Sequence, residues 1–311
     1  MPTLTETYRA NVSILQSQLN KTINRINAMR ISPFSKRNMI NQAITDANNL
    51  LKKITDKYNQ DMNASKKTCS ALLVGINYVG TANELFGCIN DTKNVQDLLK
   101  AKYNFTDIRL LNDETADKPT KQNILDGLKT LLNNAKSGDT VFFMFSGHGT
   151  CTADLNSDET DGRDELIMPI DAVSLGTCIL DDELNKVVRN GLKPGVKMIA
   201  LFDCCFSGTV LDLKYTFGEP DNANVAETMS DVFMISGCTD AQYSADTVAP
   251  INGKSMASGA MTFAFLTMIK ETAVMGELVI KMQSFLRDNG YPQRPQLSSG
   301  KKVDYSKVGF L

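Results

Sequence analysis

The sequence predicts an α/β fold with a mostly parallel central β-sheet, helices on both faces of that sheet, and a helical segment at the N-terminus. Two observations support this prediction. From residue 69 onward, short apolar runs alternate with segments of helical periodicity, which is the pattern of parallel strands joined by right-handed crossover helices. Before residue 66, apolar residues recur at helical spacing.

Two helical stripes make up the N-terminal segment, residues 1–65. The residue before a proline disfavours helix, so Ser32-Pro33 separates the stripes and an αα-hairpin is expected. Two interpretations stay open, namely packing against the main domain and a regulatory pro-segment near the active site. The stripes consist of Leu4, Tyr8, Val12, Leu15, Leu19, Ile23 and Ile26, and of Ile40, Ile44, Ala47, Leu51, Ile54 and Tyr58.

A polar linker, with Lys66 and Lys67 exposed to proteolysis, leads into the main domain, residues 66–311. Helix follows strand through this domain, with Thr120 as the cap of the helix carried by Ile124 and Leu128. A long acidic loop is expected after the third strand, and the tail beyond Pro295 is expected to add a last edge strand. Strands are predicted at 69–77, 107–112, 137–149, 196–205 and 231–237, and further helices at 90–102, 180–188, 258–270 and 276–288.

Composition narrows the class of protein. A net charge of −2 gives no reason to expect nucleic acid or an anionic membrane as a general partner. We expect no membrane span, because no apolar run approaches about 20 residues, and the N-terminus has no apolar core of signal-peptide length. The seven cysteines are an odd number without a C-x-x-C pair, which fits reduced thiols better than a disulfide framework. We therefore expect a soluble protein of the cytoplasm.

Two of the buried strands end in residues that carry chemistry. The third strand ends in SGHG at 146–149 and the fourth in DCC at 203–205, and His148 is the only histidine in the chain. Ligand chemistry in open α/β sheets collects beyond the carboxyl ends of the strands. An imidazole and a thiol at such positions indicate a cysteine nucleophile, Cys205, with His148 as its base. The backbone N–H groups of Gly149 and Cys205 are candidates for an oxyanion hole.

Asp203 lies two residues before Cys205, so both side chains share one face of the strand. A carboxylate there would by itself disfavour the thiolate. It is useful if it meets a guanidinium or ammonium group of the substrate through charge-assisted hydrogen bonds. Capping of a helix or loop is the alternative role for Asp203.

A second concentration of acidic residues follows His148. Carboxylates at this density suit a hard cation such as Ca²⁺, although a solvated acidic loop explains the charge equally well. An EF-hand over 154–165 is rejected, because Glu159 occupies the position that requires glycine. The acidic residues are Asp154, Asp158, Glu159, Asp161, Asp164, Glu165, Asp181, Asp182 and Glu183.

Four motifs make the sequence similar to the metacaspases, calcium-dependent relatives of the caspases with the caspase–haemoglobinase fold. SGHG at 146–149 matches the histidine motif of that family, and DCCFSG at 203–208 resembles its nucleophile motif DSCHSG. GCIND at 87–91 and SGAMTFAF at 258–265 resemble two further motifs. The resemblance runs from about Cys69 to the C-terminus, with a large-subunit-like part at about 69–215, a small-subunit-like part at about 230–311, and a type I arrangement.

The resemblance implies a caspase-like cysteine endopeptidase, a hydrolase that cleaves protein or peptide substrates after Arg or Lys with His148 and Cys205 as its dyad. It implies that an acidic S1 pocket selects the basic side chain. We also expect a monomer that cleaves itself in exposed loops. The implied S1 residues are Asp91, Asp203, Cys88 and Ser146. The implied calcium ligands are Asp164, Asp181, Asp182 and Asp212, with Asp161 or Glu165 as alternatives to Asp164. The candidates for self-cleavage are Lys66, Lys67 and Lys254.

The sequence departs from the family pattern at two positions and leaves two rival functions. Phe206 stands where the family usually has histidine, and Cys204 where it usually has serine. Because the missing histidine is not the dyad base, we still expect activity. One rival is a non-catalytic scaffold that binds partners through its N-terminal helices. The other is a nucleotide-binding Rossmann domain, which GINYVG at 75–80 supports only weakly, since it lacks the middle glycine of the fingerprint.

Overall fold

The computed structural model describes residues 3–64, 67–153, 163–237, 246–251 and 254–311. The chain divides into two compact units, Met1–Lys67 and Thr68–Leu311. Within the described ranges, no helix combines the length and apolar character that crossing a bilayer demands.

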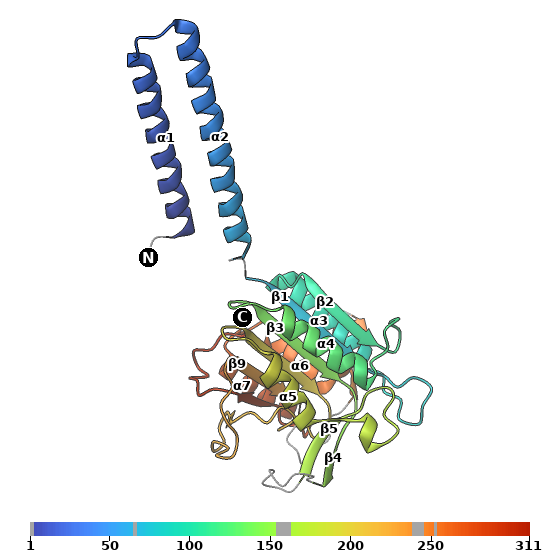
Figure 1. Cartoon of the computed structure of the whole chain (residues 1–311). Coiled ribbons are helices and arrows are strands. Elements are labelled where there is room, and N and C mark those ends of the chain that lie inside the picture. The colour runs from blue at the N-terminus through green and yellow to red at the C-terminus, as the bar shows by residue number, and fades with distance from the viewer. Residues whose placement is uncertain (1–2, 65–66, 154–162, 238–245, 252–253) are drawn as a thin grey trace. The chain divides into compact units, whose positions relative to one another are not determined.

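The first unit is an antiparallel pair of helices, α1 (Leu4–Ala28) and α2 (Pro33–Ala64) (Figure 1). Thr3 and Glu6 form a capping box that starts α1, with each residue's side chain accepting a hydrogen bond from the other's backbone N–H. Ser32 caps α2, since its hydroxyl accepts the N–H of Ser35 at 3.1 Å. The break predicted at Ser32-Pro33 is therefore the turn of the hairpin.

The second unit contains a seven-stranded sheet in the order β2-β1-β3-β7-β9-β12-β8. The neighbouring strands from β2 to β9 pair in parallel, and only β12 and β8 are antiparallel to their neighbours. The strands are β1 (Cys69–Gly75), β2 (Asp107–Asn112), β3 (Thr140–Ser146), β7 (Lys197–Asp203), β8 (Tyr215–Thr216), β9 (Asp231–Ser236) and β12 (Gln296–Ser299). The predicted mostly parallel sheet is confirmed.

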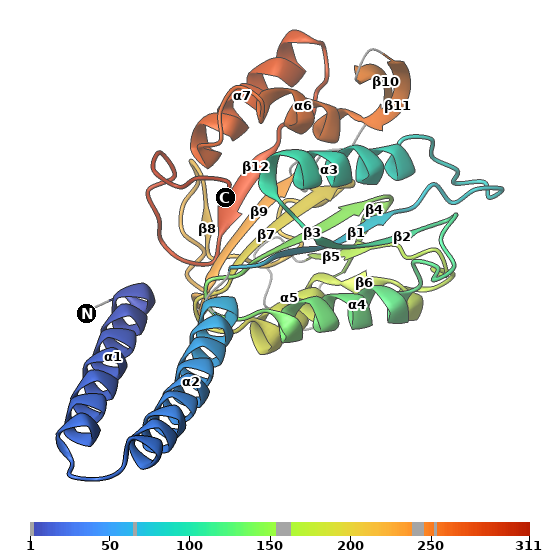
Figure 2. The same ribbon diagram turned by 90° about the horizontal axis from the view of Figure 1, so that it is seen from above.

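Helices cover both faces of this sheet (Figure 2). Consecutive residues of β1 point to opposite faces, so Leu72 and Val74 enter one core and Ala71 and Leu73 the other. The first core includes residues of α4 and α5, and the second includes residues of α3, α6 and α7. The helices are α3 (Cys88–Tyr103), α4 (Lys121–Asn134), α5 (Asp181–Gly191), α6 (Ala260–Met268) and α7 (Met275–Asp288).

Two regions differ from the sequence prediction. The segment expected to be an acidic loop contains β4 (Gly149–Ala153) and β5 (Arg163–Ile167), which form a small antiparallel sheet with β6 (Ile179–Leu180). Residues 154–162 lie outside the described part. The strand after Pro295 is present as β12, but it is not the edge, because the two-residue β8 pairs beyond it. A separate hairpin, β10 (Asp246–Ile251) with β11 (Lys254–Gly259), precedes α6.

Candidate active site

The register of β3 and β7 aligns the two candidate catalytic residues. Ser146 at the end of β3 is paired with Asp203 at the end of β7. His148 and Cys205 each follow their paired residue by two positions. Pairing extends past the strands, because the N–H of Gly147 donates to the carbonyl oxygen of Asp203 at 3.3 Å. The two residues therefore follow the same end of adjacent parallel strands.

Gly149 brings the two loops into contact. A Cβ atom at this position would collide with the carbonyl oxygen of Cys205, so only glycine lets the backbones approach this closely. Gly149 is also the first residue of β4, and it is paired with Ile167 of β5. Gly149 and Cys205, the two candidates for the oxyanion hole, are thus in contact, and Gly149 also begins the small sheet of β4, β5 and β6.

A backbone carbonyl fixes the protonation pattern of the His148 ring. The ring Nε2 lies 2.7 Å from the carbonyl oxygen of Asn83. Since a carbonyl only accepts hydrogen bonds, Nε2 must carry the proton. In the neutral ring, Nδ1 then holds the lone pair that can accept a proton. Asn83 was missed by sequence reasoning, because every residue offers the same carbonyl group.

Tyr78 holds His148 from a second direction. The two rings lie 4.7 Å apart between centroids. The phenol oxygen accepts the N–H of His148 at 2.9 Å and donates to the carbonyl of Met168 at 2.6 Å. Burial raises the pKa of the Tyr78 phenol well above its usual value, so the phenol keeps the proton that it donates. Sequence reasoning did not identify Tyr78 either.

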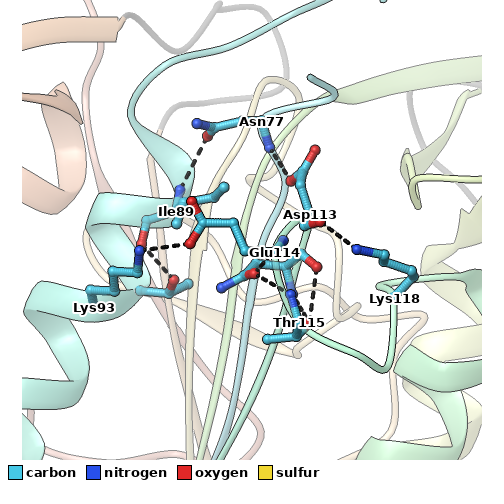
Figure 3. Close-up of polar contacts among 9 residues, drawn as sticks. Asn77, Ile89, Lys93, Asp113, Glu114, Thr115 and Lys118 are labelled. Atoms are coloured by element: carbon cyan, nitrogen blue, oxygen red, sulfur yellow. Dashed lines mark hydrogen bonds and ion pairs between the residues drawn. The ribbon is translucent and has the colours of Figure 1, made fainter. Parts of the chain in front are cut away.

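Asp113, just beyond β2, anchors the loop 76–87 that supplies these two contacts (Figure 3). Its carboxylate accepts hydrogen bonds from the N–H groups of Asn77 at 2.8 Å and Val79 at 3.1 Å. The side-chain oxygen of Asn77 in turn accepts the N–H of Ile89 at 3.1 Å, in the first turn of α3. One carboxylate thereby links the loop around His148 to the helix that carries Asp91.

The predicted S1 residue Asp91 is buried, and its hydrogen bonds come from uncharged donors. Its carboxylate accepts from the hydroxyls of Ser146 and Ser258 and from the N–H of Gly259, at 3.0 Å for Ser146 and Gly259. Burial, and then the nearby charge of Asp203, raise the pKa of Asp91 well above its usual value. Among the described residues, no Lys or Arg forms an ion pair with Asp91.

Asp203 is buried beside Asp91 and bonded to α6. It accepts the N–H of Thr262 at 2.8 Å and the hydroxyl of the same residue at 2.7 Å. A Cβ at Gly259 would collide with the carboxylate of Asp203, so this glycine lets the chain pass directly over it. Cys88 is buried on the first turn of α3, three residues before Asp91. The structure thus brings Asp91, Asp203 and Ser146 together.

The predicted calcium ligands are drawn together in part. Asp164 on β5 and Asp181 on α5 are both buried. Burial, and then the charges of Asp164 and Asp182, help to raise the pKa of Asp181 to about 6. Asp182 and Asp212 line the same cavity of about 300 Å³. Asp161, the alternative ligand, lies outside the described residues.

The donor chemistry of this cluster fits a hard dication, because its side chains are all carboxylates. In the described part of the chain, no three His, Cys, Asp or Glu side chains form a ready metal site. Buried like charges repel each other, and a dication would remove that cost. Glu165, the other alternative ligand, adjoins this cluster. Its N–H donates to Asp181 at 2.7 Å, and its carboxylate accepts the hydroxyl of Thr209 at 2.6 Å.

The two departures from the family motif have different surroundings. Cys204 is buried in the core, where it packs with β3 and β7 residues. Phe206 has a φ of 51°, a left-handed conformation that is uncommon for a bulky residue. The strained turn follows Cys205 directly, and it leads into Ser207, whose hydroxyl donates to the carbonyl of Cys204 at 2.9 Å.

Comparison with known proteins independently supports the resemblance to the metacaspases. A profile described as metacaspase, peptidase C14 domain, matches residues 69–214. Metacaspase-1 of Kluyveromyces lactis is 37% identical over 300 residues, covering 78% of this chain and 68% of that protein. Metacaspase-2 of Trypanosoma brucei brucei is 36% identical over 269 residues, covering 79% of this chain and 77% of that protein. A crystal structure of a Geobacter sulfurreducens protein shares the fold, with a TM-score of 0.57 at 22% identity, over 78% of this chain and 98% of that one.

Proposed function

Because the chain belongs to the metacaspase family of caspase-like cysteine peptidases, which are hydrolases of proteins, we propose that it is a calcium-dependent endopeptidase that cleaves after Arg or Lys. Cys205 is the proposed nucleophile and His148 the proposed base. The observation that carries this proposal is the Ser146–Asp203 pairing, from which both residues follow at equal distance along adjacent strands.

The proposed reaction begins with transfer of the Cys205 proton to Nδ1 of His148, since a thiolate is the reactive form of cysteine. Nδ1 is the ring nitrogen left as acceptor when Nε2 donates to Asn83. The sulfur attacks the scissile carbonyl, and the N–H groups of Gly149 and Cys205 stabilise the oxyanion. The imidazolium then gives its proton to the leaving amine, and water hydrolyses the thioester with His148 again as the base.

The proposed preference for Arg or Lys rests on the buried carboxylate of Asp91. Its pKa is raised by burial and by the neighbouring charge of Asp203, so a second negative charge beside Asp203 is costly in the folded protein. A guanidinium or ammonium group entering between the two would relieve that repulsion and bring charge-assisted hydrogen bonds. Ser146, which donates to Asp91, and Cys88, on the same turn of α3, would line the pocket.

Calcium, in this proposal, is held by Asp164, Asp181, Asp182 and Asp212 and supplies charge neutralisation and order rather than chemistry at the scissile bond. Asp164 lies on β5, which pairs with β4, and β4 begins at Gly149. These hydrogen bonds give a direct structural connection between the proposed ligands and a proposed oxyanion residue. The residues of the chain that act on the substrate would then be ordered by an ion that does not touch it.

The test compares fluorogenic peptides that end in Arg, Lys or Asp, with added calcium and with chelator. We expect cleavage after Arg and Lys only, dependence on calcium, and loss of activity in both Cys205→Ala and His148→Ala. Cleavage after Asp, or activity that survives Cys205→Ala, would overturn the proposal. Failure to cleave every basic peptide would favour the rival scaffold function.

Two further parts of the proposal concern processing and assembly. Self-cleavage after Lys66, Lys67 or Lys254 would give new termini in mass spectrometry of protein incubated with calcium, and their absence would contradict it. Lys66 lies outside the described residues. We also propose a monomer of the cytoplasm. One edge of the sheet is the two-residue β8, which offers few groups for a second sheet to pair with, and light scattering tests the monomer directly.

A further inference from the structure

The N-terminal helical hairpin carries a positive charge that the composition of the whole chain conceals. Residues 3–64 contain nine Lys and Arg against four Asp and Glu, a net charge of +5, whereas the remainder has 24 against 31, a net charge of −7. Residues 3–20 and residues 40–64 are each neutral overall. The whole excess therefore belongs to residues 21–39, which form the hairpin tip. Its cations are Lys21, Arg25, Arg30, Lys36 and Arg37.

No carboxylate within the tip balances these cations. The 39 residues between Glu6 and Asp46 contain no Asp or Glu at all. The carboxylates of the hairpin are Glu6, Asp46, Asp56 and Asp61, all away from the turn. Because α2 has 32 residues, it extends about 48 Å from the turn to its other end. The positive charge is thus confined to one end of an elongated element.

Large apolar side chains are exposed at the same end. Phe34 in the first turn of α2 is 74% exposed, and Met29, Ile31 and Met39 are each about 40% exposed. The turn that presents them is well bonded. Met29 N–H donates to the carbonyl of Ile26 at 3.1 Å, and the Lys36 ammonium donates to the carbonyl of Asn27 at 2.7 Å. The tip therefore holds its apolar groups in solvent as part of a defined turn.

Cations interleaved with exposed apolar side chains fit one kind of surface, the interface of an anionic bilayer. Basic residues are attracted to anionic headgroups, while apolar side chains enter the boundary of the acyl chains. A nucleic acid would use the cations but gain little from Met29, Ile31 and Met39. A second hairpin tip would bring +5 against +5, which opposes association. We propose that the hairpin tip docks peripherally on membranes that contain anionic phospholipid.

The test is sedimentation of the full chain with vesicles of phosphatidylcholine alone or mixed with phosphatidylserine. The Cys205→Ala variant is used as the parent, so that the chain stays intact if it cleaves its own linker. We expect the protein to pellet with the mixed vesicles only, and less as salt is raised, since exposed charges are screened. Equal binding to phosphatidylcholine alone would overturn the proposal.

Three variants separate the tip from the rest of the hairpin. Arg30→Glu/Arg37→Glu should abolish binding, and Phe34→Ser should weaken it about tenfold or more, since a Phe side chain is lost from the interface. Lys52→Glu/Lys53→Glu makes the same charge change at exposed positions outside the tip and should leave binding within about twofold of the parent. Equal loss in this control would show that net charge alone matters, and would overturn the assignment to the tip.

Competing occupants give distinct results. Tighter binding to single-stranded RNA than to mixed vesicles, insensitive to Phe34→Ser, would assign the tip to nucleic acid and overturn the proposal. A dimer in light scattering that Phe34→Ser converts to monomer would assign it to a second copy instead. Far-UV circular dichroism checks the fold of each variant. Phe34→Ser should retain full helicity, because the side chain is largely in solvent.

Discussion

Two groups of buried carboxylates lie in the same domain, and the fold surrounds them differently. Asp91 is surrounded by hydroxyl and backbone donors that come from the end of β3 and from the end of β11. Asp181 takes its hydrogen bonds from the backbone of Glu165 and Asp182, which belong to its own acidic cluster. Burial raises the pKa of both Asp91 and Asp181. Under the proposed function, the first group would be built in advance for the cation of a substrate, and the second would be completed by a bound calcium ion.

The largest effect is expected from a substitution in the first group, at Asp91. Asp91→Asn should lower kcat/KM for cleavage after Arg by roughly a hundredfold or more, because the substrate cation would lose one partner of a desolvated charge pair. Steady-state kinetics measures this with an Arg peptide and with a Gln peptide that the parent should cleave only slowly. That slow cleavage should be little affected by the substitution. Asp97→Asn makes the same charge change at an exposed position of α3 and is the matched control. Similar losses for the Arg and Gln peptides would refute the role in specificity.

The second group should respond to calcium rather than to substrate. Asp181→Asn/Asp182→Asn should raise the calcium concentration for half-maximal activity about tenfold or more, with less effect on activity at saturating calcium. Calcium titration of peptide cleavage measures this shift, with Asp97→Asn/Asp107→Asn as a control of equal charge at exposed positions. If the double variant keeps the parental calcium response, these residues are not the ligands.

The pH dependence of the free energy of unfolding should show what the ionisation of Asp91 costs the folded protein, separately from its role in substrate binding. The raised pKa of Asp91 means that the folded protein holds this proton more tightly than the unfolded chain does. The stabilising contribution of the protonated form is therefore present below the ordinary pKa of Asp and is lost as pH rises through the folded value. The effect of Asp91→Asn on the free energy of unfolding should therefore be more favourable at neutral pH than near pH 4. Urea unfolding at both pH values tests this, and an effect that is equal at the two pH values would contradict it.

The smallest expected effect concerns a carboxylate that only positions other groups. Asp113→Asn places an amide donor against the N–H of Asn77 or Val79, so the loop around His148 should shift. We expect kcat to fall about threefold to tenfold with KM for the Arg peptide nearly unchanged. Glu114→Gln, in an exposed ion pair with Lys93, is the matched control. A loss of thermal stability with kcat unchanged would leave Asp113 a purely structural role.

Sequence reasoning identified the elements whose signal is local. Apolar runs and helical stripes predicted the strands β1, β2, β3, β7 and β9 and both N-terminal helices, because burial on two faces or on one stripe leaves a periodic pattern. The two-residue β8 was not predicted. It also placed His148 and Cys205 at neighbouring strand ends, where the pairing of Ser146 with Asp203 brings them. Their catalytic roles, and those of the proposed S1 and calcium residues, stay predictions until they are measured.

The sequence could not reveal contacts made by the backbone or by distant donors. The carbonyl of Asn83 holds Nε2 of His148, yet a carbonyl has no residue signature. Thr262 on α6 donates twice to Asp203, which lies 59 positions earlier in the chain. The small sheet that starts at Gly149 was missed because its acidic sequence resembles a loop. A net charge taken over the whole chain likewise concealed the cations of the hairpin tip.

The paired ends of β3 and β7 set a rule for how chain length can vary in this architecture. One extra residue between Ser146 and His148 would slide the imidazole by about 3.3 Å along the strand direction, while the thiol stays where it is. An insertion in the connection from β8 to β9 moves neither strand end. Relatives should therefore differ freely in the length of that connection. The number of residues from Ser146 to His148 and from Asp203 to Cys205 should not vary. In an alignment of relatives, the absence of gaps in these two short segments would then indicate the geometry of the site, as the identity of the residues does.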